Sequence, residues 1–275
     1  MKRVALVLVL LLTACGRGEH HWLGYADGEN ALIAAPQAGW ITGVAVTRGA
    51  QAKVGDVLFT LDDTVQRQAR DSAAAVFAAA QQQQTQAQAD LDFATKELAR
   101  EQALVAHHAV SQKDLDQAQA NYSSDASKVT QAAANSSAAK AALATAEWNL
   151  SERTVRARTS GRVEDIYFRQ GEYAPSGTPV VAVLPPVNVF VRFFVPETEL
   201  NAIRPGDSVT IECDGCAKDL KARISFIAQQ AEFTPPVIYS VGNREKLVFK
   251  VEARGNGGLP LRPGLPVTVT PAAEQ

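Results

Sequence analysis

The side chains of this sequence that are most able to react or to bind a metal ion are three cysteines and four histidines. Cys213 and Cys216 flank an Asp-Gly pair, and this C-x-x-C spacing suits a disulfide, a redox pair or half of a zinc site. Asp-Gly favours a tight turn that sets its flanking residues opposite each other, ~5.5 Å apart between Cα atoms. The histidines form two adjacent pairs, His20-His21 and His107-His108, whose side chains point apart. We therefore predict a disulfide between Cys213 and Cys216 and no metal site, with two unpaired thiols as the alternative.

Cys15 ends a segment of another kind. Lys2 and Arg3 precede an apolar run that extends to Leu12, which is typical of a secretory signal and too short for a bilayer span of ~20 residues. Residues 12–15, Leu-Thr-Ala-Cys, resemble a bacterial lipoprotein lipobox, which implies cleavage before Cys15 and its lipidation. The alternative is an ordinary secretory signal with an incidental cysteine. Removing residues 1–14 leaves 25 basic and 29 acidic side chains, a net charge of −4.

No catalytic motif accompanies these residues. The sequence contains no G-x-S-x-G, H-E-x-x-H or P-loop motif, and its carboxylates are spread over polar segments. The formal net charge of −2 argues against a nucleic-acid-binding protein, which normally carries a basic footprint. With 46% hydrophobic and 20% charged residues, the chain is expected to fold. We therefore predict a folded protein that is not an enzyme.

Two similar segments, residues 38–61 and 160–183, are separated by a constant offset of 122 residues. At this offset Gly matches Gly three times and apolar residues match three times: Gly39 with Gly161, Val44 with Ile166, Gly49 with Gly171, Gly55 with Gly177, Leu58 with Val180 and Leu61 with Val183. Both segments resemble the halves of a lipoyl or biotinyl carrier domain. Val65 occupies the place where a carrier has its modified lysine, so the resemblance implies the fold without the cofactor. A cofactor-carrying enzyme subunit is the weaker alternative.

The residues between the two halves predict a helical hairpin. Residues 64–105 and 111–150 contain neither Pro nor Gly, and apolar or small residues recur at spacings of three and four. Such heptads indicate a coiled coil, and the short connection makes the helices antiparallel. Asp63 with Gln66 and Ser111 with Asp114 have capping-box spacing. The fold class is therefore α+β multidomain: a split lipoyl-type barrel-sandwich hybrid with an inserted antiparallel coiled-coil hairpin, followed by a β-barrel domain.

The predicted hairpin tip carries Arg100, Leu104 and Ser111. This R-x(3)-L-x(6)-S spacing resembles the tip motif of periplasmic adaptor proteins (membrane fusion proteins, HlyD type) that dock on TolC-type outer-membrane channels. Arg100 and Leu104 lie one helical turn apart on the same face, and Ser111 is placed to cap the returning helix. The plainer interpretation is that Leu104 belongs to the helix seam, Arg100 is solvated and Ser111 only caps.

The last third is rich in β-type residues, with strands expected near 187–195, 208–213, 217–228, 246–253 and 264–270. It resembles the β-barrel of the same adaptors, and residues 232–240 resemble short adaptors that accompany ABC exporters. The expected domains are the signal peptide (1–14), a tether (15–33), the lipoyl-like domain (34–62 and 154–184), the hairpin (63–153) and the barrel with a reduced membrane-proximal region (185–275).

The resemblance implies a periplasmic adaptor of a tripartite efflux or secretion system. Such a protein is lipid-anchored at the inner membrane, forms a ring of three to six copies, and joins an inner-membrane transporter, here of ABC type, to a TolC-type channel. The alternatives are an adaptor of an RND or MFS pump and, from another class, a structural coiled-coil lipoprotein without a transport role.

Overall fold

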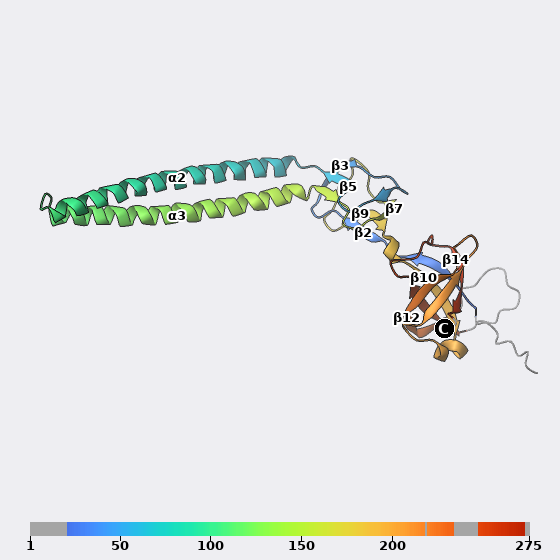
Figure 1. The fold of residues 1–275 in the computed structure, drawn as a ribbon. Helices are drawn as coiled ribbons and strands as arrows, with labels where there is room; N and C mark the ends of the chain where they lie inside the picture. The colour runs from blue at the N-terminus through green and yellow to red at the C-terminus, as the bar shows by residue number, and fades with distance from the viewer. Residues whose placement is uncertain (1–20, 218, 234–246, 273–275) are drawn as a thin grey trace, which may run out of the picture.

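The computed structural model describes residues 21–217, 219–233 and 247–272. The chain is elongated, with a long helical rod at one end, a small β-sandwich in the middle and a β-barrel at the other end (Figure 1). The α-helical hairpin is inserted into a β-rich fold, so the predicted fold class is confirmed.

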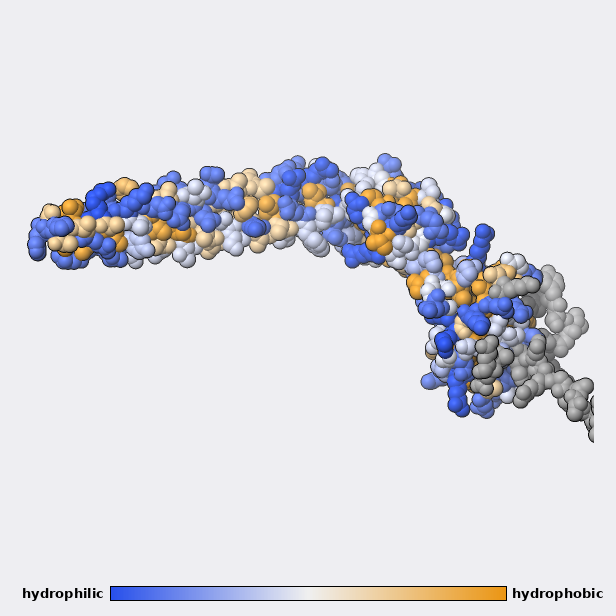
Figure 2. Space-filling model, in the orientation of Figure 1, coloured by the Kyte–Doolittle hydropathy of each residue, from blue (hydrophilic) through white to orange (hydrophobic). Residues whose placement is uncertain are grey.

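The rod consists of α2 (Thr64–Ala106) and α3 (Gln112–Ser151), which run antiparallel. Its few buried residues are mostly small: Ala80, Ala94, Leu98, Ala118 and Ser136. Small side chains let the two backbones approach closely but bury little apolar area. Hydrophilic and hydrophobic residues are interspersed along its visible face (Figure 2). At 1.5 Å per residue, each helix spans roughly 60 Å.

The sandwich is built from both halves of the internal repeat. One sheet has the order β2-β9-β7-β4 and the other β6-β5-β3-β8. The strands are β2 (Ala31–Ala34), β3 (Gly39–Val44), β4 (Gln51–Ala52), β5 (Val57–Leu61), β6 (Thr154–Arg156), β7 (Gly161–Ile166), β8 (Tyr173–Ala174) and β9 (Pro179–Leu184). Each sheet therefore contains strands from before and after the inserted hairpin. This pairing holds the start of α2 and the end of α3 side by side at the base of the rod.

The hydrogen bonds of the sandwich obey the same offset of 122 residues. Gly39 pairs with Ala174 and Ala52 pairs with Gly161, which are the same pair with the two halves exchanged. The matched glycines share a left-handed backbone, with φ of 85° at Gly49 and 87° at Gly171. A non-glycine residue is strained in this conformation, which explains why glycine recurs at these turns.

The barrel closes in the order β1-β10-β13-β12-β11-β14. These strands are β1 (Trp22–Gly28), β10 (Val189–Pro196), β11 (Ser208–Glu212), β12 (Leu220–Phe233), β13 (Leu247–Arg254) and β14 (Pro266–Pro271). Two 3-10 helices, η1 (Pro186–Asn188) and η2 (Glu197–Ala202), flank β10.

The expectation of a tether over residues 15–33 is wrong for its described part. Trp22–Gly28 is the barrel strand β1, hydrogen-bonded to both β10 and β14, and Ala31–Ala34 is the sandwich strand β2. Trp22 stacks on Phe193 at 5.5 Å between ring centroids, and its indole N–H donates to Glu199 at 2.7 Å. The glycines of this segment suggested a flexible tether, but Gly24 lies where a Cβ would collide with the backbone of Arg192.

The predicted capping box at the start of α2 is also wrong, whereas the one at the start of α3 is confirmed. Asp63 occupies the N-cap of α2 but makes no side-chain cap hydrogen bond, because its carboxylate pairs with Arg67 at 2.7 Å. Asp62 instead accepts hydrogen bonds from the amide and hydroxyl of Thr64 at 3.0 and 2.7 Å.

Candidate docking site at the hairpin tip

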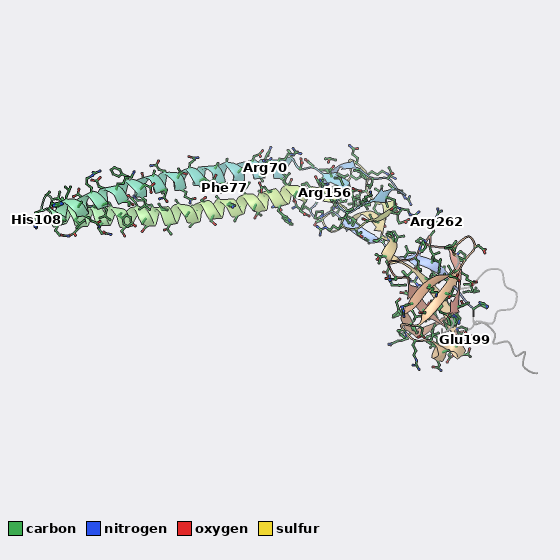
Figure 3. The ribbon with its side chains drawn as sticks, viewed as in Figure 1. Arg70, Phe77, His108, Arg156, Glu199 and Arg262 are labelled. Carbon is green, nitrogen blue, oxygen red and sulfur yellow. A yellow bond between two sulfur atoms is a disulfide. The ribbon has the colours of Figure 1, made fainter. Side chains whose placement is uncertain are left out.

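The tip of the rod is a tight reversal between α2 and α3, and His108 marks its far end in Figure 3. The backbone N–H groups of His107 and Ala109 both donate to the carbonyl of Leu104, at 3.1 and 3.0 Å. His108 has a φ of 55°, a left-handed conformation that usually falls to glycine after a helix. The carbonyl of Leu104 therefore fixes the reversal, while its half-buried side chain remains at the surface of the tip.

Ser111 is the N-cap of α3 and forms a reciprocal capping box with Asp114. Its hydroxyl accepts a hydrogen bond from the Asp114 amide at 3.3 Å and donates one to the Asp114 carboxylate at 2.6 Å. The same carboxylate accepts from the Ser111 amide at 3.2 Å. These bonds satisfy amide groups that the first turn of a helix leaves without a partner. Ser111 thus sets the point at which the chain turns back.

Arg100 lies one turn before Leu104 and is 60% exposed. One guanidinium nitrogen, Nη1, contacts both carboxylate oxygens of Glu97, at 2.9 and 2.8 Å. An exposed ion pair within one helix contributes only about 0.3–0.5 kcal/mol. The guanidinium can therefore exchange Glu97 for an acceptor on a partner at little cost in free energy. The sequence did not identify Glu97 as a partner of Arg100. The spacing of three residues on one helix is the signal that could have identified it.

Glu101 is a residue of the tip to which the sequence analysis gave no role. The residue is half-buried, and within the described residues its buried oxygen Oε2 has no hydrogen-bond partner. A buried carboxylate oxygen without a partner destabilises the site. Glu101 therefore adds a half-buried carboxyl group next to Arg100, near the end of α2.

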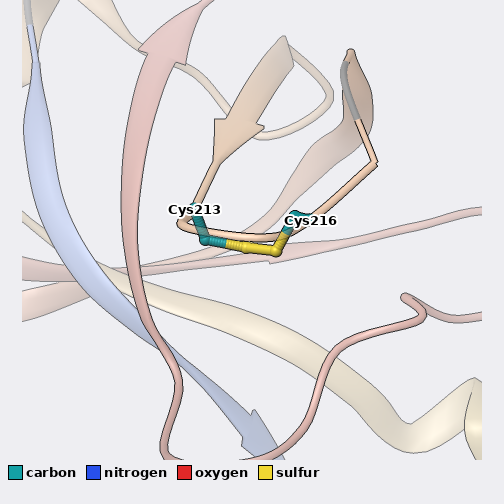
Figure 4. The surroundings of a disulfide bond; sticks show 2 residues. All are labelled: Cys213 and Cys216. Atoms are coloured by element: carbon teal, nitrogen blue, oxygen red, sulfur yellow. A yellow bond between two sulfur atoms is a disulfide. The ribbon is translucent and has the colours of Figure 1, made fainter.

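The two cysteines Cys213 and Cys216 lie in the barrel, far from the tip, and form a disulfide with their Cα atoms 5.4 Å apart (Figure 4). They were expected at paired strand positions. The β11–β12 ladder instead ends at Ile211 and Leu220, so both cysteines lie in the loop beyond it. The amide of Cys216 donates to the carbonyl of Cys213 at 3.2 Å, and Gly215 has a φ of 79°. The disulfide closes this turn against the end of the barrel core.

The remaining sequence predictions fall on other parts of the chain. Cys15 and the signal segment lie outside the described residues. Val65, at the expected carrier-lysine position, is exposed in the first turn of α2. The residues that the structure describes contain no group of three or more His, Cys, Asp or Glu side chains that could hold a metal ion. None of the helices within the described ranges is long and apolar enough to cross a membrane.

The hairpin matches a known protein family, and the whole chain is similar to known proteins. The family described as "RND MFP, alpha-helical hairpin domain" matches residues 64–152. The uncharacterized protein YdhJ of Escherichia coli K12 is 30% identical over 206 residues, which cover 75% of this chain and 67% of YdhJ. A UPF0194 membrane protein of Acidithiobacillus ferridurans is 27% identical, with 98% of this chain and 95% of that protein covered.

Among solved structures, MacA from Actinobacillus actinomycetemcomitans has a similar fold. Its crystal structure superposes with a TM-score of 0.71 and 20% sequence identity, covering 92% of this chain and 78% of MacA. The likeness extends over the hairpin, the sandwich and the barrel together.

Proposed function

The chain belongs to the membrane fusion protein family of periplasmic adaptors, and we propose that it is the adaptor subunit of a tripartite efflux or secretion system. In this role it joins an inner-membrane transporter to a TolC-type outer-membrane channel. Members of this family are in general not enzymes, and energy for transport comes from the partner. Substrate passes through the assembly without being altered by this chain.

The single observation that carries the proposal is the clustering of Arg100, Leu104 and Ser111 at the apex of a long rod. The reversal is anchored on the Leu104 carbonyl and the return helix begins at Ser111, while Arg100 lies one turn earlier. A solvated seam does not require these three residue types together at the reversal. An elongated chain with a barrel at one end and this tip at the other is suited to connect two partners (Figure 1).

The proposed docking chemistry follows from the contacts at the tip. Arg100 releases Glu97 and donates its planar, forked N–H groups to backbone carbonyls or carboxylates at the end of a channel helix. Leu104 fills an apolar groove between channel helices, in the manner of a helix-in-groove contact. Ser111 stays on Asp114 and holds the reversal in shape.

The inner-membrane partner that we propose is an ABC-type transporter, with the chain being a short adaptor of the HlyD type. This proposal rests on the resemblance of residues 232–240, of which 234–240 lie outside the described residues. An RND or MFS pump is the second candidate, and the RND hairpin family that matches residues 64–152 favours it. Crosslinking in cells and identification of the captured transporter distinguishes the two.

The remaining parts of the proposal concern attachment and assembly. We propose that lipid on Cys15 holds the chain at the inner membrane and that three to six copies form a ring around the transport path. We further propose that the sandwich carries no lipoyl or biotinyl group, because Val65 stands where the modified lysine would be.

The docking proposal is tested with Arg100→Glu and Leu104→Asp. Both variants are expected to reduce co-purification of the outer-membrane channel by at least about tenfold, since each puts a negative charge where the partner must be approached closely. Circular dichroism should show unchanged helix content. Arg70→Glu is the matched control, because Arg70 lies on the same helix at the base of the rod (Figure 3) and should retain the channel. Wild-type export and channel capture in both tip variants would refute the docking assignment.

A further inference from the structure

The internal repeat allows the outer faces of the two sandwich sheets to be compared position by position. The inner faces of both sheets meet in one core, so their outer faces lie on two different sides of the domain. Three outward positions on β3 and β8 correspond, at the offset of 122 residues, to three on β7 and β4. The backbone pairing is the same in both, so any difference in side chains reflects something other than the fold.

The outer face of β3 and β8 is aromatic, and we call Trp40, Thr42 and Tyr173 the aromatic face. Trp40 and Tyr173 are a cross-strand pair with ring centroids 5.3 Å apart in an edge-to-face arrangement. They are 57% and 50% exposed, so neither ring contributes its full area to the core. Thr42 is exposed and its hydroxyl bonds to that of Thr60 at 2.9 Å. The result is an exposed apolar surface with a hydroxyl rim.

The matched positions on β4 and β7 are Gln51, Arg162 and Glu164, which we call the charged face. Gln51 and Arg162 are the cross-strand pair that corresponds to Tyr173 and Trp40. Glu164 contacts the guanidinium of Arg162 at 2.8 Å from Nε, along one edge of the group. Arg48 extends this face and donates from Nε to the carbonyl of Glu164 at 3.2 Å.

The comparison shows that this backbone folds with polar and charged side chains at these positions. Trp40 and Tyr173 are therefore not required by the sandwich, and large exposed aromatic pairs of this kind are typical of interaction surfaces. Aromatic faces attract guanidinium groups, and arginine stacks on tryptophan and tyrosine with its plane. Glu164 binds one edge of the Arg162 guanidinium group. The flat face of the guanidinium therefore remains available to stack on an aromatic ring.

We propose that the aromatic face of one copy of this chain packs on the charged face of the next copy. The contact joins two different surfaces of the same domain, so it is head-to-tail, and a head-to-tail contact closes into a ring when its rotation permits. Trp40 and Tyr173 supply the anchors, and Arg162 and Arg48 stack on them. This inference rests on the ring assembly of the proposed function and names the surfaces that would build it.

The test uses the full lipidated chain in detergent, with self-association measured by analytical ultracentrifugation. Trp40→Ala with Tyr173→Ala, and separately Arg48→Glu with Arg162→Glu, are each expected to raise the dissociation constant by at least about tenfold. Trp148→Ala is the matched control, since Trp148 is 59% exposed but lies on α3, and it should associate like wild type.

Mixing the two double variants gives the decisive measurement. In a head-to-tail contact, the aromatic-face variant keeps an intact charged face and the charged-face variant keeps an intact aromatic face. Together they are expected to form a heterodimer with wild-type affinity, although each alone stays monomeric. Labelling one variant identifies the mixed species by mass.

Three results would overturn the inference: a wild-type chain that stays monomeric, a mixture that forms no heterodimer, or a Trp148→Ala variant as weakened as the double variants. Failure of the proposed function is recognised separately: the wild-type chain would self-associate but capture no channel. A monomeric chain that captures the channel through its tip would refute the interface and leave the docking site intact.

Discussion

At the scale of single residues, the tip is organised by contacts within the chain itself. The side chain of Ser111 accepts a hydrogen bond from the backbone of Asp114, and the side chain of Asp114 accepts one from the backbone of Ser111. Ser111 therefore caps α3 in addition to any role in docking. Arg100 likewise has its own partner in Glu97. Docking as proposed would therefore exchange weak internal contacts for contacts with a partner, and substitutions must separate the two tasks.

Ser111→Ala and Ser111→Asn make that separation. Alanine removes the cap and should lower the local stability of the first turn of α3 by about 1 kcal/mol, whereas asparagine is itself a good N-cap and should stay close to wild type. Hydrogen exchange of the amides that follow Ser111 reports the difference. Channel capture lost in both variants would show that the serine hydroxyl itself contacts the partner. Equal exchange in all three proteins would contradict the capping account.

At the scale of elements, the base of α2 depends on two neighbouring carboxylates. The hydrogen bond from the Arg67 guanidinium lowers the pKa of the Asp63 carboxyl, and the Thr64 hydroxyl lowers the pKa of Asp62 in the same way. Because both pKa values are lower in the folded chain, this stabilisation is present above the unfolded value of about 3.9 and is lost as the pH falls through the folded pKa.

We therefore expect the first turn of α2 to fray as the pH is lowered from 5 toward 3. The protection of amides 64–70 against hydrogen exchange, taken relative to the intrinsic rate of an unfolded chain at each pH, should fall in this window. The Asp62→Asn, Asp63→Asn double variant serves as the comparison, since it has no carboxylate to protonate there. A transition of the same size in that variant would exclude these two groups as its cause.

At the scale of the whole molecule, the N-terminal strand closes a barrel whose other strands come from the last third of the chain. Trp22 in β1 is buried against Phe193, whereas its neighbour Leu23 is 73% exposed. Trp22→Ala should reduce the free energy of unfolding by about 3–5 kcal/mol through the cavity it leaves. Leu23→Ala should change it by less than about 0.5 kcal/mol. Chemical denaturation of the full chain measures both, and similar effects would mean that β1 does not close the core.

The sequence by itself determined the hairpin, the repeat and the tip residues, because each depends on local signals. Helix seams repeat every three or four residues, the turn glycines recur at a fixed offset, and Ser111 caps a residue three positions away. These patterns are visible before any distant contact forms.

Only the tertiary structure decided the role of residues 22–28, the place of the disulfide and the difference between the two sandwich faces. Strand β1 pairs with residues more than 160 positions away. Its own sequence contains glycines and carries no sign of these partners, which is why a tether was expected. Cys213 and Cys216 lie outside the β11–β12 ladder because strand pairing stops at Ile211 and Leu220. Strand pairing and burial across such separations depend on the packing of the whole chain, which local periodicity does not encode.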